Sequence, residues 1–189
     1  MNIGKTYLRP TLSFLAVAVL LFGFVYTGIV TGIAQLIFPY QANGSIIEDE
    51  SGSSGASSYG SALMGQEFSG AAYLIGRPSG VSQLAPAGAE QRALVAERIK
   101  ALHALDPENT ALIPIDLITA SGSGYDPYIS SSSAEYQVSR IARTRGISEA
   151  DVRKIIQKYT VHPFLGFFGE EGVNVLLVNL SLDGLNISE

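Results

Sequence analysis

An uninterrupted apolar run from Leu12 to Phe38 constrains this chain more than any other feature, because it carries no charged residue. The nearest charges are Arg9 before it and Glu48 after it. A helix needs about 20 mostly apolar residues to cross the ~30 Å hydrocarbon core of a bilayer. Inside that core the backbone must satisfy its own hydrogen bonds, which favours one continuous helix. We therefore predict a transmembrane helix over residues 12–38, followed by a domain held at a membrane surface.

Two alternatives compete with this membrane anchor. A cleaved signal peptide has a basic start and a small-x-small cleavage site, and here Lys5 and Arg9 supply the first and residues 32–34 the second. The apolar region of a signal peptide spans only about 7–15 residues, whereas this run stays apolar to Phe38. The other alternative, a buried core helix, seldom runs this long without a charge. Length therefore favours the anchor over both.

A pair of glycines four residues apart, Gly28 and Gly32, lies in the second half of the predicted helix. Small residues at this spacing let a neighbouring helix approach closely, so we expect a helix-packing face there. The competing explanation is composition, because glycine is common in membrane helices. A lone span cannot form a transport path, so any transport role must be shared with other chains.

Charge bias around the span predicts its orientation. Lys5 and Arg9 precede it, whereas the first basic residue after it is Arg77, and acidic residues 48–50 come before that. Cytoplasmic flanks of membrane helices are enriched in Lys and Arg. We therefore expect a cytoplasmic N-terminus and a large domain on the outer side.

Composition excludes several classes of function. Of the 189 residues, those after the span suffice for one domain with a sizeable core. There is no cysteine, which excludes disulfides, thiolate zinc sites and a cysteine nucleophile. Two of the 12 basic residues, Lys5 and Arg9, precede the span, and 10 follow it. All 17 acidic residues also follow it, so the part after the span has a formal charge of −7. Such an acidic domain is not expected to bind nucleic acid.

The chain is expected to have an α+β fold, with a single N-terminal transmembrane helix followed by one mixed α/β soluble domain. We predict four parts, namely a short cytoplasmic tail (1–11), the helix (12–38), a juxtamembrane segment with a Gly/Ser linker at 51–58 (39–59) and an extracytoplasmic domain (60–189). Hydrophobic periodicity predicts helices over 90–105, about 133–145 and 148–159, and strands over 113–119 and 173–182. Residues 60–68 and 71–80 are expected as short strands or extended arms.

Capping residues predict where the later helices begin and end. Ser133 or an earlier serine is expected to cap the helix that ends near Arg145, because a serine oxygen accepts the free N–H groups of a first turn. Gly146 is expected to end that helix, since glycine readily adopts the left-handed conformation. Ser148 is expected to cap the helix that follows.

No catalytic set or metal site is predicted from the residues. The turn Ser121-Gly122-Ser123-Gly124 follows a predicted strand and is a candidate phosphate-binding loop, although it is also explained as a tight turn with capping serines. A hydrolase with Ser121 or Ser123 as its nucleophile lacks an identifiable base. Asp116 and Asp126 form a carboxylate pair of a kind that any soluble domain contains.

Motifs spread over most of the chain carry a family resemblance. They are Leu8-Arg9-Pro10, Phe38-Pro39, residues 41–45, residues 60–66, residues 76–79, residues 119–127, Gln137-Val138 with Arg140, and residues 173–183. In these motifs the sequence resembles the C subunit (KdpC) family of the Kdp potassium-transporting ATPase. The segment from Gly80 to Glu90 departs from the family, which usually carries a tyrosine-asparagine segment and a serine-glycine-rich run there.

The resemblance implies a subunit of a four-part complex in the bacterial plasma (inner) membrane. In that complex the A subunit binds potassium, the B subunit is a P-type ATPase that hydrolyses ATP, and a small F peptide is also present. The C subunit is implied to be non-catalytic, without an active site or a tightly bound cofactor of its own, and to be needed for assembly and activity. Its expected partners are therefore the A, B and F subunits and membrane lipid, and K⁺ is the transported ion.

The resemblance also implies an alternative, a catalytic chaperone that binds ATP together with the B subunit and raises its nucleotide affinity. Gln137 and the turn Ser121, Gly122, Ser123 and Gly124 are the positions expected to bind the nucleotide. ATP is cytoplasmic, whereas the charge bias places this domain outside. We give the topology argument more weight, because it rests on the whole span.

Overall fold

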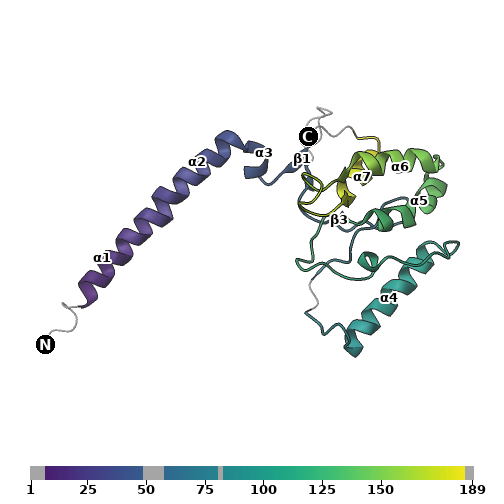
Figure 1. Ribbon diagram of the computed structural model, residues 1–189, viewed down its shortest axis with the longest axis horizontal. Coiled ribbons are helices and arrows are strands. Elements are labelled where there is room, and N and C mark those ends of the chain that lie inside the picture. Colours follow the sequence, from purple (N-terminus) through teal and green to yellow (C-terminus); the bar gives the residue numbers. More distant parts are fainter. Residues whose placement is uncertain (1–6, 49–57, 81–82, 186–189) are drawn as a thin grey trace. The chain divides into compact units, whose positions relative to one another are not determined.

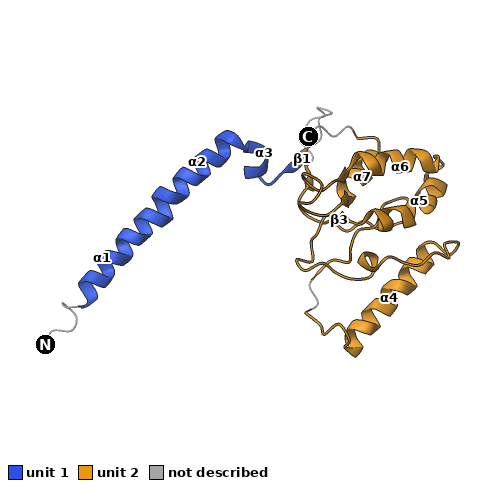
Figure 2. Ribbon diagram, viewed as in Figure 1, with its two compact units in different colours: residues 1–46 blue, residues 47–189 orange. Residues whose placement is uncertain are grey.

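The computed structural model describes residues 7–48, 58–80 and 83–185. The chain divides into two compact units, residues 1–46 and residues 47–189 (Figure 2). The second unit therefore begins earlier than residue 60, the start predicted for the domain. Most of the predicted Gly/Ser linker lies outside the described residues, and only Ser58 is described.

The first unit is dominated by one helix, Arg9–Ile37, of 29 residues, whose most apolar stretch has a mean hydropathy of 2.3. It consists of α1 (Arg9–Ala18), a π-helical middle η2 (Val19–Tyr26) and α2 (Thr27–Ile37) (Figure 1). Its length of about 40 Å exceeds the hydrocarbon thickness of a bilayer. None of its most apolar stretch is buried within the structure, which argues against the buried core helix.

The long helix ends at Phe38, as the sequence predicts, because Pro39 has no N–H with which to continue it. Phe38 leaves the helical conformation at φ −131° and ψ 55°, and Pro39 opens the single turn α3 (Pro39–Ala42). The amides of Gln35 and Asn43 then exchange hydrogen bonds of 3.2 and 3.3 Å. These two polar side chains close the apolar helix with a polar end.

The second unit combines short strands with helices (Figure 1). Its central sheet is antiparallel in the order β3-β5-β4, and a separate pair joins β1 to β2. Tyr128 pairs with Asn174 across β3 and β5, and Thr160 pairs with Val173 across β4 and β5. The elements are β1 (Ile46–Glu48), β2 (Ser58–Ser61), α4 (Ala89–Leu105), η3 (Ile115–Leu117), β3 (Tyr128–Ile129), α5 (Ser131–Arg145), α6 (Glu149–Lys158), β4 (Thr160–Val161), β5 (Gly172–Asn174) and α7 (Val175–Leu182).

The core lies between the sheet and three helices, α5, α6 and α7. Fully buried side chains come from each of them, for example Val138 on α5, Val152 on α6, Val173 on β5 and Val178 on α7. By contrast, α4 follows the predicted boundaries but contributes no buried residue. The pocket described below therefore lies on a sheet supported by α5 and α7 rather than by α4.

The predicted caps of α5 and α6 are confirmed. The Ser130 hydroxyl, rather than that of Ser133, accepts the backbone N–H of Ser133 at the start of α5. Gly146 ends that helix in the left-handed conformation, at φ 68°. The Ser148 hydroxyl accepts the backbone N–H of Asp151 at 3.1 Å and so begins α6.

The predicted strand over residues 173–182 is wrong in its larger part. Only Gly172–Asn174 is a strand, and the chain then turns into helix α7. The Asn174 side chain caps that helix by accepting the N–H of Leu177 at 3.1 Å. Most of α7 is buried, so its apolar residues show no helical stripe, and a short apolar run of this kind does not distinguish a strand from a buried helix.

The predicted strand over residues 113–119 is also wrong, because the segment forms the short 3₁₀ turn η3. Pro114 has no N–H to donate to a strand partner. Asp116 accepts hydrogen bonds from Ser130 and Ser133 instead, which fastens the turn to the start of α5. The glycine-serine turn at 121–124 leads into β3, and no helix follows it directly.

Of residues 71–80, expected as a short strand or an extended arm, none is in a strand: residues 71 and 72 lie in a turn, and residues 74–76 have no regular secondary structure. We refer to residues 71–77 as the extended arm. Side-chain amides replace a strand partner here. The Asn179 amide exchanges hydrogen bonds with the backbone of Leu74 at 2.8 and 2.9 Å, and Gln137 does the same with Ile75 at 2.8 and 3.0 Å. The arm is thereby held against α5 and α7.

Candidate functional site

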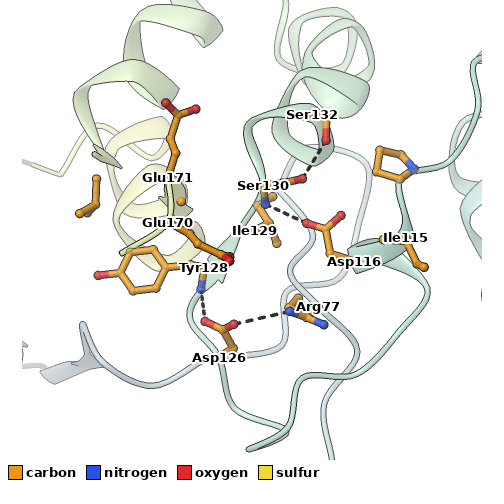
Figure 3. A pocket seen from close by; sticks show the side chains of 13 residues that line it. Arg77, Ile115, Asp116, Asp126, Tyr128, Ile129, Ser130, Ser132, Glu170 and Glu171 are labelled. Carbon is orange, nitrogen blue, oxygen red and sulfur yellow. Dashed lines mark hydrogen bonds and ion pairs between the residues drawn. The ribbon is translucent and has the colours of Figure 1, made fainter. Parts of the chain in front are cut away.

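A pocket of about 680 Å³ opens beside the sheet where β3 meets α5 (Figure 3). Its lining is acidic, with four carboxylates against one guanidinium. The lining residues are Arg77, Pro114, Ile115, Asp116, Asp126, Tyr128, Ile129, Ser130, Ser132, Val161, Glu170, Glu171 and Gly172. Asp116 and Asp126, separate in the sequence, therefore share one pocket.

Asp116 is fixed on η3 by donors at the start of α5. Its Oδ2 accepts the Ser130 N–H at 2.8 Å (Figure 3), and its Oδ1 accepts the hydroxyl of Ser133. Burial alone raises the pKa of this carboxyl, but the hydrogen bonds from Ser133 and Ser130 outweigh it and hold the pKa below its ordinary value. Asp116 is therefore ionised at neutral pH.

Asp126 connects the strand to the extended arm. Its Oδ1 accepts the N–H of Tyr128 at 3.0 Å, and its Oδ2 lies 3.7 Å from the Arg77 guanidinium (Figure 3). Arg77 also donates to the carbonyl oxygen of Ala120 at 3.2 Å. The one cation of the pocket is therefore held in place by groups of its own domain.

Glu170 and Glu171 enter the pocket from the segment before β5. Glu171 accepts hydrogen bonds from the Ser131 hydroxyl and from Nδ1 of His162, the latter at 3.1 Å. The Ser131 hydrogen bond is the main reason that the pKa of Glu171 lies below its ordinary value. Glu170 makes no hydrogen bond or ion pair among the described residues.

The chemistry of this pocket suits a positively charged group. Four carboxylates and one guanidinium give a formal charge of −3, which attracts cations and repels anions such as nucleotide phosphates. The serine hydroxyls in the lining, Ser130 and Ser132, hydrogen-bond to each other at 2.9 Å, and the backbone N–H of Ser130 donates to the Asp116 carboxylate. Within the described ranges, no cluster of His, Cys, Asp and Glu is arranged to hold a metal ion.

Gln137, one of the positions expected to bind nucleotide, is buried on α5 with only 1% of its surface exposed. Its carbonyl oxygen accepts the Ile75 N–H and a guanidinium N–H of Arg140, at 2.8 and 2.7 Å. Its NH₂ group donates to the carbonyl oxygens of Ile75 and Ser133. The amide thus makes four hydrogen bonds within the domain, and two of them hold the extended arm.

Residues 121–123 of the turn line a different, open pocket together with Tyr125 and Leu63, whereas Gly124 is buried. Gln137 does not line that pocket. The Ser121 hydroxyl accepts the Gly124 N–H at 2.9 Å, as a capping serine does. Gly124 has φ +76°, and a Cβ there would come within 2.6 Å of Gly80. The capping and the glycine requirement both belong to a tight turn.

The glycines predicted to pack against a partner helix are unobstructed. A Cβ added at Gly28 or at Gly32 would meet no other atom of the chain within 4 Å. Neither glycine is therefore required by contacts within the described part of the chain. This leaves both positions free for an external contact.

Sequence reasoning missed the polar side chains that position the arm. Asn179, fully buried on α7, lies in the segment that the sequence predicts as a strand, and the sequence indicates Arg140 only as part of a family motif. Arg140 is 3% exposed and donates to carbonyl oxygens of the arm, including that of Tyr73 at 3.0 Å. Burial lowers its pKa to about 10, so it remains charged at neutral pH. An asparagine inside an apolar run was the one available indication.

The fold identifies the class of protein: a chain with one apolar helix of membrane-spanning length and one small α+β domain. The family model for KdpC, the c chain of the K⁺-transporting ATPase, matches residues 8–184. The chain therefore belongs to the KdpC family. It is a subunit of a potassium-transporting ATPase.

Individual relatives agree with the family. The chain is 45% identical over 190 residues to the potassium-transporting ATPase KdpC subunit of Sorangium cellulosum, covering 94% of this chain and 97% of that one. It is 47% identical over 182 residues to the KdpC subunit of Listeria welshimeri, with coverages of 95% and 96%. The KdpC subunit of Methylibium petroleiphilum is 44% identical over 192 residues, with coverages of 95% and 98%.

Proposed function

We propose that this chain is a non-catalytic subunit that is needed for assembly and activity of a potassium pump in the bacterial plasma membrane. Its helix Arg9–Ile37 crosses the membrane once, with the N-terminus in the cytoplasm and the C-terminal domain outside. It associates there with the potassium-binding A subunit, the ATP-hydrolysing B subunit and the F peptide.

One observation carries this proposal, the exposure of the long helix. Large apolar side chains are uncovered along its length, for example Phe14 at 76%, Phe24 at 70% and Leu36 at 85%. Water is a poor solvent for such a surface, whereas lipid and neighbouring helices are good ones. The glycines on this helix supply the surface on which a neighbouring helix can approach most closely.

The double substitution Gly28→Leu, Gly32→Leu tests the association. Because a Cβ at either position meets no other atom of the chain within 4 Å, the C-terminal domain is expected to stay folded while co-purification of the A and B subunits falls. Ala34→Leu is the matched control, since 100° per residue places it about 120° or more around the helix from both glycines. Unchanged co-purification of the double variant would refute the proposed packing face.

Orientation has its own test, which uses the absence of cysteine from the chain. Lys154→Cys on α6 introduces one thiol at an exposed position. A membrane-impermeant maleimide is expected to label it in intact cells. Labelling only after lysis would place the domain in the cytoplasm and reverse the proposed orientation.

ATP binding is the second candidate function, and the exposed hydroxyls of the Ser121–Gly124 turn favour it. Ser123 accepts the N–H of Tyr125 at 3.2 Å and lines the open pocket. We expect Mg-ATP to bind the full chain in nanodiscs at millimolar concentration, and Ser123→Ala to weaken it more than Ser132→Ala in the acidic pocket. The absence of any heat of binding in titration calorimetry would remove this function.

A further inference from the structure

The segment between β4 and β5 exposes an unusual amount of apolar surface for an acidic domain. We refer to residues 164–168 as the hairpin tip. Its large side chains all face solvent, namely Phe164 at 71%, Leu165 at 69%, Phe167 at 69% and Phe168 at 59%. Exposed apolar side chains that are contiguous in this way, unlike single ones, mark interaction surfaces.

The hairpin tip is a folded element of defined geometry. Phe164 and Phe168 exchange two backbone hydrogen bonds, with N···O distances of 2.8 and 2.9 Å. The rings of Phe167 and Phe168 lie 4.2 Å apart between centroids. The phenyl groups are thus held together on a closed turn, so little ordering is required when they contact an apolar phase.

Leu165 occupies a backbone conformation that disfavours its own side chain. Its φ is +54°, in the left-handed region that glycine and asparagine adopt much more readily. The side chain is largely exposed and therefore contributes little to the core of the domain. A strained residue that the core does not use indicates a role outside the domain.

The connection between the two units keeps the domain close to the bilayer. The chain between the end of α2 at Ile37 and the start of β1 at Ile46 cannot extend beyond about 30 Å. If the long helix spans the membrane, the domain always stays within reach of lipid. The tether raises the effective concentration of the domain at the bilayer, so even a small apolar tip is sufficient for contact.

We propose that the hairpin tip inserts its four apolar side chains into the interfacial region of the bilayer that holds the N-terminal helix. Phenylalanine and leucine side chains enter this region readily, as they do in surface-bound helices. No charged residue lies between Pro163 and Gly169, and Glu170 and Glu171 follow directly. These carboxylates repel anionic headgroups, so the lipid recognised is zwitterionic.

Tryptophan fluorescence of the full chain tests the insertion, because the chain has no tryptophan of its own. Phe167→Trp introduces one at the hairpin tip, and Tyr125→Trp is the matched control on an aromatic residue 53% exposed. Both variants are reconstituted into phosphatidylcholine vesicles containing brominated lipid. The tip tryptophan is expected to show blue-shifted emission and several-fold stronger quenching than the control.

Two outcomes of that measurement overturn the proposal. Water-like emission of the tip tryptophan places the tip in solvent, and equal quenching of both tryptophans shows contact that is not specific to the tip. A second variant separates lipid from protein, since Phe167→Ser, Phe168→Ser removes only exposed rings. If lipid is the occupant, this double variant still co-purifies with the other ATPase subunits. Loss of co-purification by a folded variant assigns the tip to a protein partner instead.

Discussion

The long N-terminal helix and α7 are both mainly apolar, and neither carries a charge apart from Arg9 at the start of the first, yet they lie in opposite environments. The first, Arg9–Ile37, has none of its most apolar stretch buried. The second, Val175–Leu182, has six buried residues among its eight. Hydrophobicity alone therefore does not decide whether a helix enters lipid or a protein core. Length does, because eight residues span only about 12 Å, far less than a bilayer.

A buried polar group adds to this difference. Asn179 sits in the middle of α7 with both ends of its amide paired to the backbone of Leu74. A buried amide is tolerated only where partners are supplied, and the extended arm supplies them. The middle of the N-terminal helix, from Val19 to Tyr26, has no side chain comparable to this asparagine.

Substitution of Asn179 is expected to have the largest effect on the folded domain. Asn179→Leu leaves the N–H and the carbonyl of Leu74 buried without partners, at about 1–3 kcal/mol for each group. We expect a loss of about 4 kcal/mol in the free energy of unfolding, measured by urea denaturation of the full chain in nanodiscs. A loss below about 1 kcal/mol would show that water replaces the amide.

A matched pair of leucine truncations compares the two helices directly. Leu176→Ala on α7 removes a side chain that is 2% exposed, and we expect it to cost about 2–5 kcal/mol. Leu36→Ala on the N-terminal helix removes one that is 85% exposed and is expected to change unfolding of the domain by less than about 0.5 kcal/mol. Equal losses would contradict the division into two units.

Acid is expected to destabilise the domain through Asp116 and to leave the long helix unaffected, because Arg9–Ile37 contains no Asp, Glu or His. The pKa of Asp116 is lowered on folding, so the folded domain binds fewer protons than the unfolded chain. The resulting stability is present above the ordinary carboxyl pKa of 3.8 and is lost as the pH falls through the lower folded value. Asp116→Asn should therefore flatten the stability profile below about pH 5, as followed by thermal unfolding.

The smallest effect is expected at the surface of α5 and α6, where Arg153 contacts Glu135 and Glu149 at 2.7 and 2.8 Å. Exposed ion pairs contribute little, because water and salt screen them. Arg153→Gln is expected to leave the thermal midpoint of the domain within experimental error at physiological salt. A clear drop that persists in 1 M salt would show that these contacts are more than surface pairs.

The elements that the sequence predicted well are those whose ends are set by capping or helix-terminating residues. Ser148 and Gly146 fix helix ends through their own hydroxyl and backbone conformation, and Pro39 ends the long helix in the same local manner. The strand predictions for residues 113–119 and 173–182 were wrong because contacts with residues far away in the sequence set the conformation of each segment. Asp116 is held by α5, and α7 is buried on most sides.

The pocket and the hairpin tip show the same limit for functional surfaces. Asp116 and Asp126 were visible as acidic residues, but only folding brings them together with Glu171 from the far end of the chain. The phenylalanines of the tip could equally have formed part of the core. Their exposure depends on where β4 and β5 place the turn.

By itself the sequence determined the membrane-spanning length of the N-terminal helix, the ends of α5 and α6, and the family. These follow from contiguous composition and from contacts within a few residues, which need no knowledge of the rest of the chain. Only the tertiary structure decided that α7 is helical, that Gln137 holds the arm and that the acidic residues share a pocket. Those outcomes depend on contacts between residues far apart in sequence, such as Asn179 with Leu74, whose burial and pairing exist only once the domain has folded.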